Sequence, residues 1–125
     1  MVNNNKILVV EDEIQIRKVI TMYLKKAGFS VIETDNGKEA LSLARKEKPD
    51  LIILDIMLPG LSGYEVCKTL KTEKDTSSII IIILSAKGQE SEKTEGYEVG
   101  ADYYETKPFS PKQLVSRIKT FLTQN

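Results

Sequence analysis

Five consecutive isoleucines, at positions 79–83, constrain the fold of this chain more than any other feature of its sequence. A strand with one face in water alternates apolar and polar side chains, because successive side chains point to opposite faces of the sheet. An unbroken apolar run predicts instead a strand covered on both faces, as in the middle of a parallel sheet with helices on either side. The run is far too short to span a bilayer.

Short apolar runs alternate along the whole chain with segments that have the spacing of amphipathic helices. The predicted strands are residues 6–10, 30–34, 51–54, 79–84 and 103–106. The predicted helices follow them, at residues 14–27, from 37, from 63, over 89–99 and from 111 to 122. Asn36 with Glu39 and Ser62 with Glu65 have the spacing of helix-capping boxes. This alternation predicts an α/β fold, with a single doubly wound five-stranded parallel sheet and five helices on both faces.

The composition excludes several kinds of chemistry. The chain of 125 residues has no histidine, which excludes a Ser/His/Asp triad, a Cys/His pair and a histidine-ligated zinc site. Its single cysteine, Cys67, excludes an internal disulfide and a thiolate cluster, and the apolar helical position of Cys67 predicts a core residue. The 18 basic and 18 acidic side chains cancel, so we expect no direct nucleic-acid binding and no membrane binding. The single cysteine and the lack of an apolar signal core at the start predict a cytoplasmic location.

Four of the five predicted strands end in a charged or hydroxyl side chain. Glu11 and Asp12 follow the first strand, Asp55 the third, Ser85 the fourth and Lys107 the fifth. Each of these residues alone is more typical of a turn, a helix cap or a solvated surface. In a doubly wound sheet, however, ligands bind beyond the carboxyl ends of the strands. We therefore expect these five side chains to lie together at one edge of the sheet.

Three carboxylates at one edge need a counter-charge. Two carboxylates about 4 Å apart repel each other by about 4 kcal/mol at an effective dielectric constant of about 20. Lys107 supplies part of the compensation, and a hard cation with oxygen ligands, Mg²⁺, suits the rest. A cation, a lysine, a hydroxyl and a reactive carboxylate are the groups needed for phosphoryl transfer onto that carboxylate.

The same residues belong to four motifs through which the chain resembles the receiver domain of bacterial two-component response regulators. The motifs are residues 9–12, 55–63, 84–87 and 100–109. They have the order and spacing of that family, and the similarity extends from Lys6 to about Leu122. The resemblance implies a flavodoxin-like sheet with strand order 2-1-3-4-5. It also implies one receiver domain over residues 1–125, with no output domain in this chain.

The resemblance implies a role for each site residue in a phosphorelay. Asp55 would accept a phosphoryl group from the phosphohistidine of a histidine kinase or phosphotransfer protein and become an aspartyl phosphate. Asp12, Asp55 and the main-chain carbonyl of Met57 would ligate Mg²⁺ directly, and Glu11 would do so through water. Lys107, joined by a cis peptide bond to the following proline, would pair with Asp55 and then with the phosphoryl group.

A conformational switch is implied as well. The hydroxyl of Ser85 would bind the phosphoryl group, and Tyr104 would then rotate inward. Two or three charge-assisted hydrogen bonds of about 1.5–3 kcal/mol would supply the roughly 5.5 kcal/mol that inverts a two-state equilibrium. The helix predicted at residues 89–99 has an internal glycine and a small apolar face, so we expect it to move. The output surface would comprise this helix, the fifth strand and the fifth helix.

Two departures from the common family pattern bear on the target of that surface. Tyr103 stands where many relatives carry an acid, which in transcription regulators pairs with the last helix of a second copy. Glu105 stands where an apolar residue is usual. Asp102 and Arg117 remain for such a homodimer after phosphorylation. An exposed pair of Tyr103 and Tyr104 would instead bind another protein, and Tyr103 as a plain surface residue is equally consistent with the sequence.

Met57 and Lys87 lie two positions beyond Asp55 and Ser85, where the family flanks the water that hydrolyses the acyl phosphate. A methionine cannot orient water by hydrogen bonding, so we expect slow autodephosphorylation. Met57 also argues against one alternative, a Mg²⁺-dependent phosphohydrolase, which would have a second acid at this position. The other alternative is a binding module without phosphoryl chemistry, and the intact site residues argue against it. We expect a signalling protein rather than an enzyme.

Overall fold

The computed structural model describes residues 5–86 and 100–123. The elements in these ranges are β1 (Lys6–Val10), α1 (Ile14–Lys26), β2 (Ser30–Thr34), α2 (Gly37–Glu47), β3 (Leu51–Asp55), α3 (Gly63–Thr72), β4 (Ile80–Ala86), β5 (Tyr103–Lys107) and α5 (Pro111–Thr123). All strand pairs are parallel, and the sheet order is β2-β1-β3-β4-β5, so the predicted fold is confirmed. The fourth predicted helix, residues 89–99, lies outside the described residues. No helix within the described ranges has the length and apolar character to cross a membrane.

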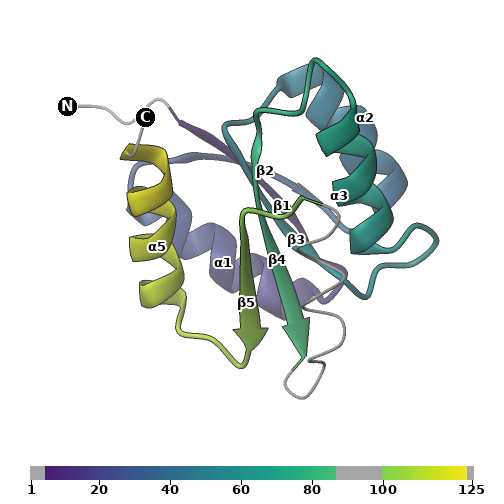
Figure 1. Cartoon of the computed structure of the whole chain (residues 1–125). Helices are drawn as coiled ribbons and strands as arrows, with labels where there is room; N and C mark the ends of the chain where they lie inside the picture. The colour runs from purple at the N-terminus through teal and green to yellow at the C-terminus, as the bar shows by residue number, and fades with distance from the viewer. Residues whose placement is uncertain (1–4, 87–99, 124–125) are drawn as a thin grey trace.

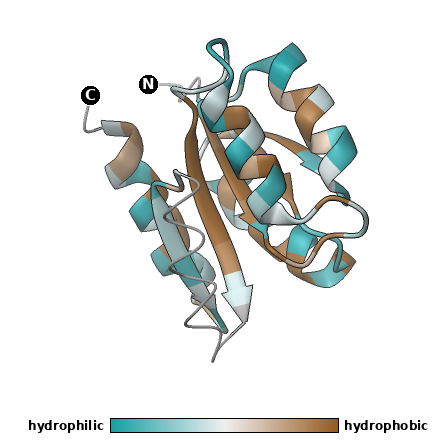
Figure 2. Cartoon of the chain, turned by 45° about the vertical axis from the view of Figure 1, so that its right-hand side comes forward, coloured by the Kyte–Doolittle hydropathy of each residue, from teal (hydrophilic) through white to brown (hydrophobic). Residues whose placement is uncertain are grey.

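Helices cover both faces of the sheet, with α1 and α5 on one face and α2 and α3 on the other (Figure 1). Side chains along each strand alternate between two cores. In β3, for example, Leu51 and Ile53 pack beneath α1 and α5, while Ile52 and Leu54 pack beneath α2 and α3. Figure 2 shows the resulting hydrophobic strands at the centre of the molecule. The two cores hold the carboxyl ends of the strands in a fixed register.

The isoleucine run forms most of the interior strand β4, which pairs with β3 on one side and β5 on the other. Ile81 and Ile83 belong to the core beneath α2 and α3, and Ile82 and Leu84 belong to the opposite core. All four side chains are fully buried. The strand covered on both faces, which the run predicted, is therefore confirmed.

The predicted capping box is complete at the start of α3 and only half formed at the start of α2. Ser62 and Glu65 form the complete capping box at the start of α3. Asn36 accepts a hydrogen bond from the Glu39 main-chain N–H at 2.8 Å, as predicted. The Glu39 carboxylate, however, accepts a hydrogen bond from the Thr34 hydroxyl at 2.5 Å. The Glu39 carboxylate is therefore bound to Thr34 at the end of β2 rather than to the Asn36 main chain, as the predicted capping box would require.

Cys67 is fully buried in α3, which confirms its prediction as a core residue. Burial raises the pKa of its thiol to about 11. At neutral pH the thiol is therefore protonated and packs as a small apolar side chain.

Candidate functional site

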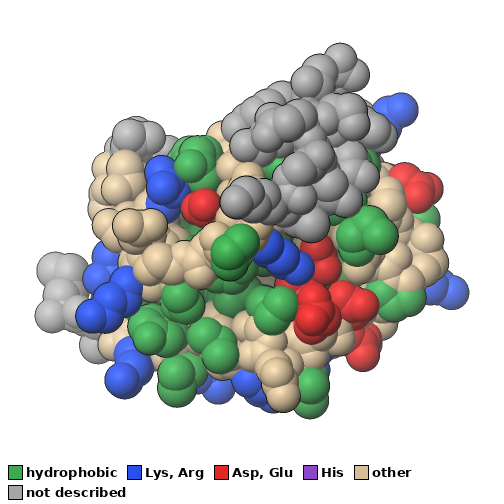
Figure 3. All heavy atoms as spheres, turned by 90° about the horizontal axis from the view of Figure 1, so that it is seen from below, with side chains coloured by type: hydrophobic (Ala, Val, Ile, Leu, Met, Phe, Trp, Pro, Cys, Tyr) green, Lys and Arg blue, Asp and Glu red, His purple; other side chains and the backbone are tan. Residues whose placement is uncertain are grey.

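The carboxyl ends of the parallel strands deliver the predicted site residues to one edge of the sheet. In the β3–β4 register Asp55 lies opposite Leu84, and in the β4–β5 register Lys107 lies opposite Ala86. The N–H of Glu11, just beyond β1, donates to the Thr34 carbonyl at 3.1 Å. Figure 3 looks onto this edge and shows a group of acidic side chains next to a basic one, with hydrophobic side chains beside them.

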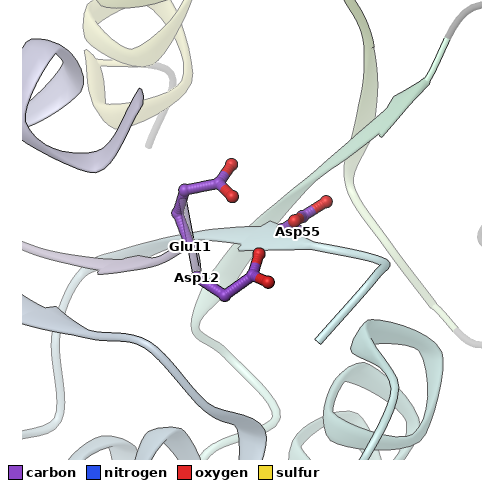
Figure 4. Close-up of side chains that lie close together, drawn as sticks. All are labelled: Glu11, Asp12 and Asp55. Carbon is purple, nitrogen blue, oxygen red and sulfur yellow. The ribbon is translucent and has the colours of Figure 1, made fainter. Parts of the chain in front are cut away.

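Three carboxylates lie around a common space at this edge (Figure 4). One oxygen from each of Glu11, Asp12 and Asp55 lies within 4.8 Å of the oxygens of the other two. Glu11 and Asp55 are buried, with 0% and 3% of their surface exposed, whereas Asp12 is exposed. The space is therefore lined by two buried carboxyl groups and opens to solvent beside the third.

Lys107 is the basic residue facing these acids. Its Nζ lies 3.4 Å from Asp55 Oδ1, 3.1 Å from Glu11 Oε1 and 4.0 Å from Glu13 Oε1. Burial alone would lower the pKa of Lys107, but the charges of Asp55 and Glu11 outweigh burial and raise that pKa. One ammonium group thus faces several carboxylates, and the site keeps an excess of negative charge.

Burial makes the two inner carboxyl groups of the site hold protons more tightly than exposed ones. Burial raises the pKa of Glu11 to about 7, and the nearby charge of Asp55 adds to the effect. Burial also raises the pKa of Asp55, although the charge of Lys107 opposes this. Both buried carboxyl groups are therefore more costly to ionise than exposed ones, and a bound cation would lower that cost.

The donor set at this edge fits a hard divalent cation such as Mg²⁺. It consists of carboxylate oxygens, which Mg²⁺ prefers over nitrogen or sulfur. Glu11 Oε1 is buried, and the charged group facing it is the Lys107 ammonium at 3.1 Å. The main chain of Met57 lies close by, since its N–H donates to Asp55 Oδ1 at 3.4 Å. The buried carboxylate oxygens have one ammonium between them, so a bound cation would complete the compensation of their charge.

Ser85 contributes a hydroxyl group from the end of β4. The residue is 2% exposed, and its side-chain oxygen has no hydrogen-bond partner in the part of the chain that the structure describes. Leaving a buried hydroxyl unpaired costs about 1–3 kcal/mol. An anion bound at this edge would supply the missing acceptor.

Arg17 supports the site, and no sequence motif pointed to it. Its Nη1 donates to the Glu11 carbonyl at 2.9 Å, and its Nε pairs with Glu33 at 3.1 Å. Glu13 adds a second local contact, because its N–H donates to Glu11 Oε2 at 3.2 Å. The loop between β1 and α1 is thus held from two sides. The helical position of Arg17 is typical of a solvated basic residue, so only the three-dimensional contact reveals its role.

The expectation of an exposed tyrosine pair is wrong for Tyr104. Tyr104 is 4% exposed and packs in the core beneath α2 and α3, because neighbouring residues in a strand face opposite sides of the sheet. Its hydroxyl lies 3.2 Å from the hydroxyl of Tyr64. Tyr103 is half-buried on the other side, with the Arg117 guanidinium 4.5 Å above its ring and the Phe121 ring 5.8 Å away.

Asp102 and Arg117, which we expected to be available to a second copy, have partners inside the chain. Asp102 Oδ2 accepts hydrogen bonds from Lys71 Nζ and from the Ile81 main-chain N–H, both at 2.8 Å. Arg117 Nε lies 3.3 Å from Glu105 Oε1. A homodimer through these residues would compete with these internal contacts. Lys87, the remaining predicted site residue, lies outside the described residues.

Comparisons with known proteins agree with this arrangement. A family model described as the response regulator receiver domain matches residues 7–119. The phosphate regulon transcriptional regulatory protein PhoB of Pseudomonas aeruginosa is 50% identical over 116 residues, which cover 93% of this chain and 51% of that protein. The alkaline phosphatase synthesis transcriptional regulatory protein PhoP of Bacillus subtilis is 48% identical over 122 residues, which cover 98% of this chain and 50% of that protein. The chain spans about half the length of these curated relatives.

Solved structures give the same result. A putative response regulator from Chloroflexus aurantiacus superposes with a TM-score of 0.92 at 36% identity, covering 98% of this chain and 100% of that one. The chemotaxis response regulator CheY4 of Vibrio cholerae superposes with a TM-score of 0.88 at 32% identity, covering 94% of this chain and 98% of that one. The family model, the relatives and the fold all confirm the resemblance seen in the sequence motifs, and the chain belongs to the response regulator receiver domain family.

Proposed function

We propose that this receiver domain, residues 1–125, acts in phosphorelay signalling by accepting a phosphoryl group on Asp55 from a phosphohistidine. The donor is a histidine kinase or a phosphotransfer protein. The observation that carries the proposal is the convergence of Asp55 with Glu11, Asp12 and Lys107 at the carboxyl edge of the sheet. The domain is a signalling protein, and its only chemistry is its own phosphorylation and slow dephosphorylation.

Asp55 acts as the nucleophile in this proposal. A carboxylate oxygen of Asp55 forms the new O–P bond while the N–P bond of the phosphohistidine breaks, and the departing imidazole takes a proton from solvent. Lys107 favours the ionised form of Asp55, because its positive charge lowers the pKa of that carboxyl group. Bound Mg²⁺, held by Glu11, Asp12, Asp55 and the Met57 carbonyl, would neutralise charge on the transferring group.

Ser85 and Lys107 would bind the phosphoryl group once it is on Asp55. The Ser85 hydroxyl, buried and without a partner in the described ranges, would donate to a phosphoryl oxygen. The Lys107 ammonium would shift from the Asp55 carboxylate to a second phosphoryl oxygen. These new bonds favour the inward conformation of Tyr104 and change the surface formed by β5, α5 and the helix predicted at residues 89–99. The target of that surface is a second copy of the chain or another protein.

A hydrophobic groove beside the acids suits the protein that delivers the phosphoryl group. It lies between α1 and the segment joining β5 to α5, and its lining includes Ile16, Val19, Phe109 and Lys107. Val19 is 40% exposed, so an apolar side chain of the groove is accessible to a partner. Because Lys107 belongs to both the groove and the acidic site, a donor bound in the groove would hold its phosphohistidine next to Asp55.

The experiment is phosphorylation by acetyl phosphate in the presence of Mg²⁺, followed by mass spectrometry of the intact protein. We expect one phosphoryl group on the wild type and none on Asp55→Asn. Asp50→Asn, which changes an exposed acid just before the same strand, is the matched control and should be phosphorylated normally. No adduct on the wild type would favour a pure binding module. Sustained release of phosphate from phosphomonoesters would favour a phosphohydrolase.

A further inference from the structure

Two tyrosine hydroxyl groups from different layers of the fold meet inside the protein. Tyr64 lies at the start of α3 and Tyr104 lies in the middle of β5, and their oxygens are 3.2 Å apart. The two residues are only 8% and 4% exposed and belong to the same hydrophobic core. Tyr104 is therefore turned inward in this structure.

The position of Tyr64 is set by the main chain of Asp55. Gly63, which precedes Tyr64, packs so closely that a Cβ there would lie 2.4 Å from the Asp55 carbonyl oxygen. The Gly63 N–H also donates to the Ile56 carbonyl at 2.9 Å. The capping box at Ser62 fixes the first turn of α3 in the same place. A displacement of the main chain at Asp55 would therefore be transmitted directly to Tyr64.

Tyr104 is thus connected to the site by two contiguous routes. One runs through β4, where Ile83 lies opposite Tyr104 in the sheet register and Ser85 lies two residues further along. The other runs from Asp55 through Gly63 to the Tyr64 hydroxyl. The second route consists of main-chain packing and one side-chain hydrogen bond.

We propose that Tyr64 is a positioning residue for Tyr104, and that the hydrogen bond between their hydroxyl groups couples the Asp55 site to the inward conformation. The proposal rests on the proposed function and adds a regulatory contact to the same site. A hydrogen bond of ordinary strength shifts a two-state population by about two- to ten-fold. A ligand that needs the inward state then binds more weakly by the same factor when the bond is removed.

The test is a titration with beryllofluoride, a phosphoryl analogue, in saturating Mg²⁺, monitored by NMR on four variants and the wild type. Tyr64→Phe and Tyr104→Phe each remove one hydroxyl and keep the ring. We expect each to weaken apparent beryllofluoride affinity by about two- to ten-fold, and the double variant to be no weaker than either single variant. Tyr23 is a half-buried tyrosine of α1, so Tyr23→Phe is the matched control and should bind like the wild type.

The outcomes separate this inference from the function on which it rests. A wild type that binds no beryllofluoride overturns the proposed function and the inference with it. A wild type that binds, with Tyr64→Phe binding equally well or with additive losses in the double variant, overturns only the inference. Urea unfolding of each variant gives the stability change independently. A loss of stability without a loss of affinity would assign Tyr64 a purely structural role.

Discussion

The Lys107 ammonium lies 3.4 Å from the Asp55 carboxylate, although the strands that carry the two residues, β5 and β3, are separated by β4. The lysine side chain therefore reaches across the end of the intervening strand. It also lies 3.1 Å from Glu11, so that one cation serves residues at the ends of two strands that are not its neighbours. This geometry makes Lys107 a counter-charge in the resting site.

We expect Lys107→Ala to separate cation binding from anion binding. Mg²⁺ should bind at least as well as to the wild type, because the substitution removes a positive charge that repels the metal. Beryllofluoride should bind at least about ten-fold more weakly, because one charge-assisted hydrogen bond is lost. Calorimetric titrations with each ligand measure both effects. Lys112→Ala, an exposed lysine in α5, is the control, and parallel loss of both ligands in Lys107→Ala would contradict the proposed role.

The affinity for Mg²⁺ should rise with pH through neutrality. The pKa of Glu11 is about 7 in the metal-free protein, so this ligand is protonated at lower pH and free to bind at higher pH. In the unfolded chain Glu11 has its ordinary pKa of 4.5. Between pH 4.5 and about pH 7 the folded protein therefore keeps a proton on Glu11 that the unfolded chain has released. Without metal, the contribution of Glu11 to stability therefore falls as pH rises through this window.

Thermal unfolding with and without Mg²⁺, from about pH 6 to about pH 8, measures this linkage on either side of the Glu11 pKa of about 7. The increase in melting temperature caused by Mg²⁺ should grow with pH. Glu13→Gln removes a neighbouring acid that is exposed, and should keep the same pH dependence. A Mg²⁺ effect that is constant over the range would show that Glu11 is not the titrating group.

Arg17→Ala should weaken Mg²⁺ binding by at least about ten-fold, because it removes a charged donor, typically worth about 1.5–3 kcal/mol, from the Glu11 carbonyl. Lys18→Ala is a matched control, since Lys18 also pairs with Glu33, at 3.2 Å, but does not donate to the Glu11 carbonyl as Arg17 does. Calorimetry on the two variants separates the loop contact from the shared ion pair. Equal affinities in both variants would contradict a positioning role for Arg17.

The strands could be predicted from the sequence because their signals are local. Runs of β-branched residues mark β1 to β4, two adjacent tyrosines mark β5, and the isoleucine run alone identified the interior strand β4. The meeting of Asp12 and Asp55 followed from the rule that parallel strands end at one edge. The roles of these residues in metal binding and phosphoryl transfer remain predictions, as does the helix at residues 89–99.

Side-chain contacts between distant segments could not be predicted from the sequence where the strand-end rule does not apply. The Tyr64–Tyr104 pair spans 40 residues, and the Lys71–Asp102 pair spans 31. Neither pair has a spacing that marks it, because the fold alone brings the two segments together. The opposite directions of Tyr103 and Tyr104, by contrast, follow from the alternation of side chains along β5, so the expected exposed pair neglected a local signal.

Val19→Asp should slow phosphorylation by a protein donor and leave phosphorylation by acetyl phosphate unchanged. The groove lined by Val19 would lose apolar contact and gain a charge that must be desolvated, which typically costs ten-fold or more in affinity, about 1.4 kcal/mol. The measurement compares the rate of phosphoryl transfer from a phosphorylated kinase with the rate from acetyl phosphate. Met22→Asp changes another exposed apolar residue of α1 outside the groove lining, and should retain the donor protein's rate. Equal loss in both variants would contradict a specific groove.

Met57 is 63% exposed beside the Asp55 carboxylate, and its thioether cannot orient a water molecule for attack on an aspartyl phosphate. Met57→Asn would supply an amide that can, and we expect decay of the phosphorylated domain to accelerate about ten-fold, the equivalent of about 1.4 kcal/mol from one hydrogen bond. Loss of the phosphoryl group over time is followed by intact mass after removal of the donor. Met57→Leu keeps an apolar side chain of similar size and should decay like the wild type. If the asparagine and leucine variants decay at the same rate, the residue at position 57 does not control the lifetime of the signal.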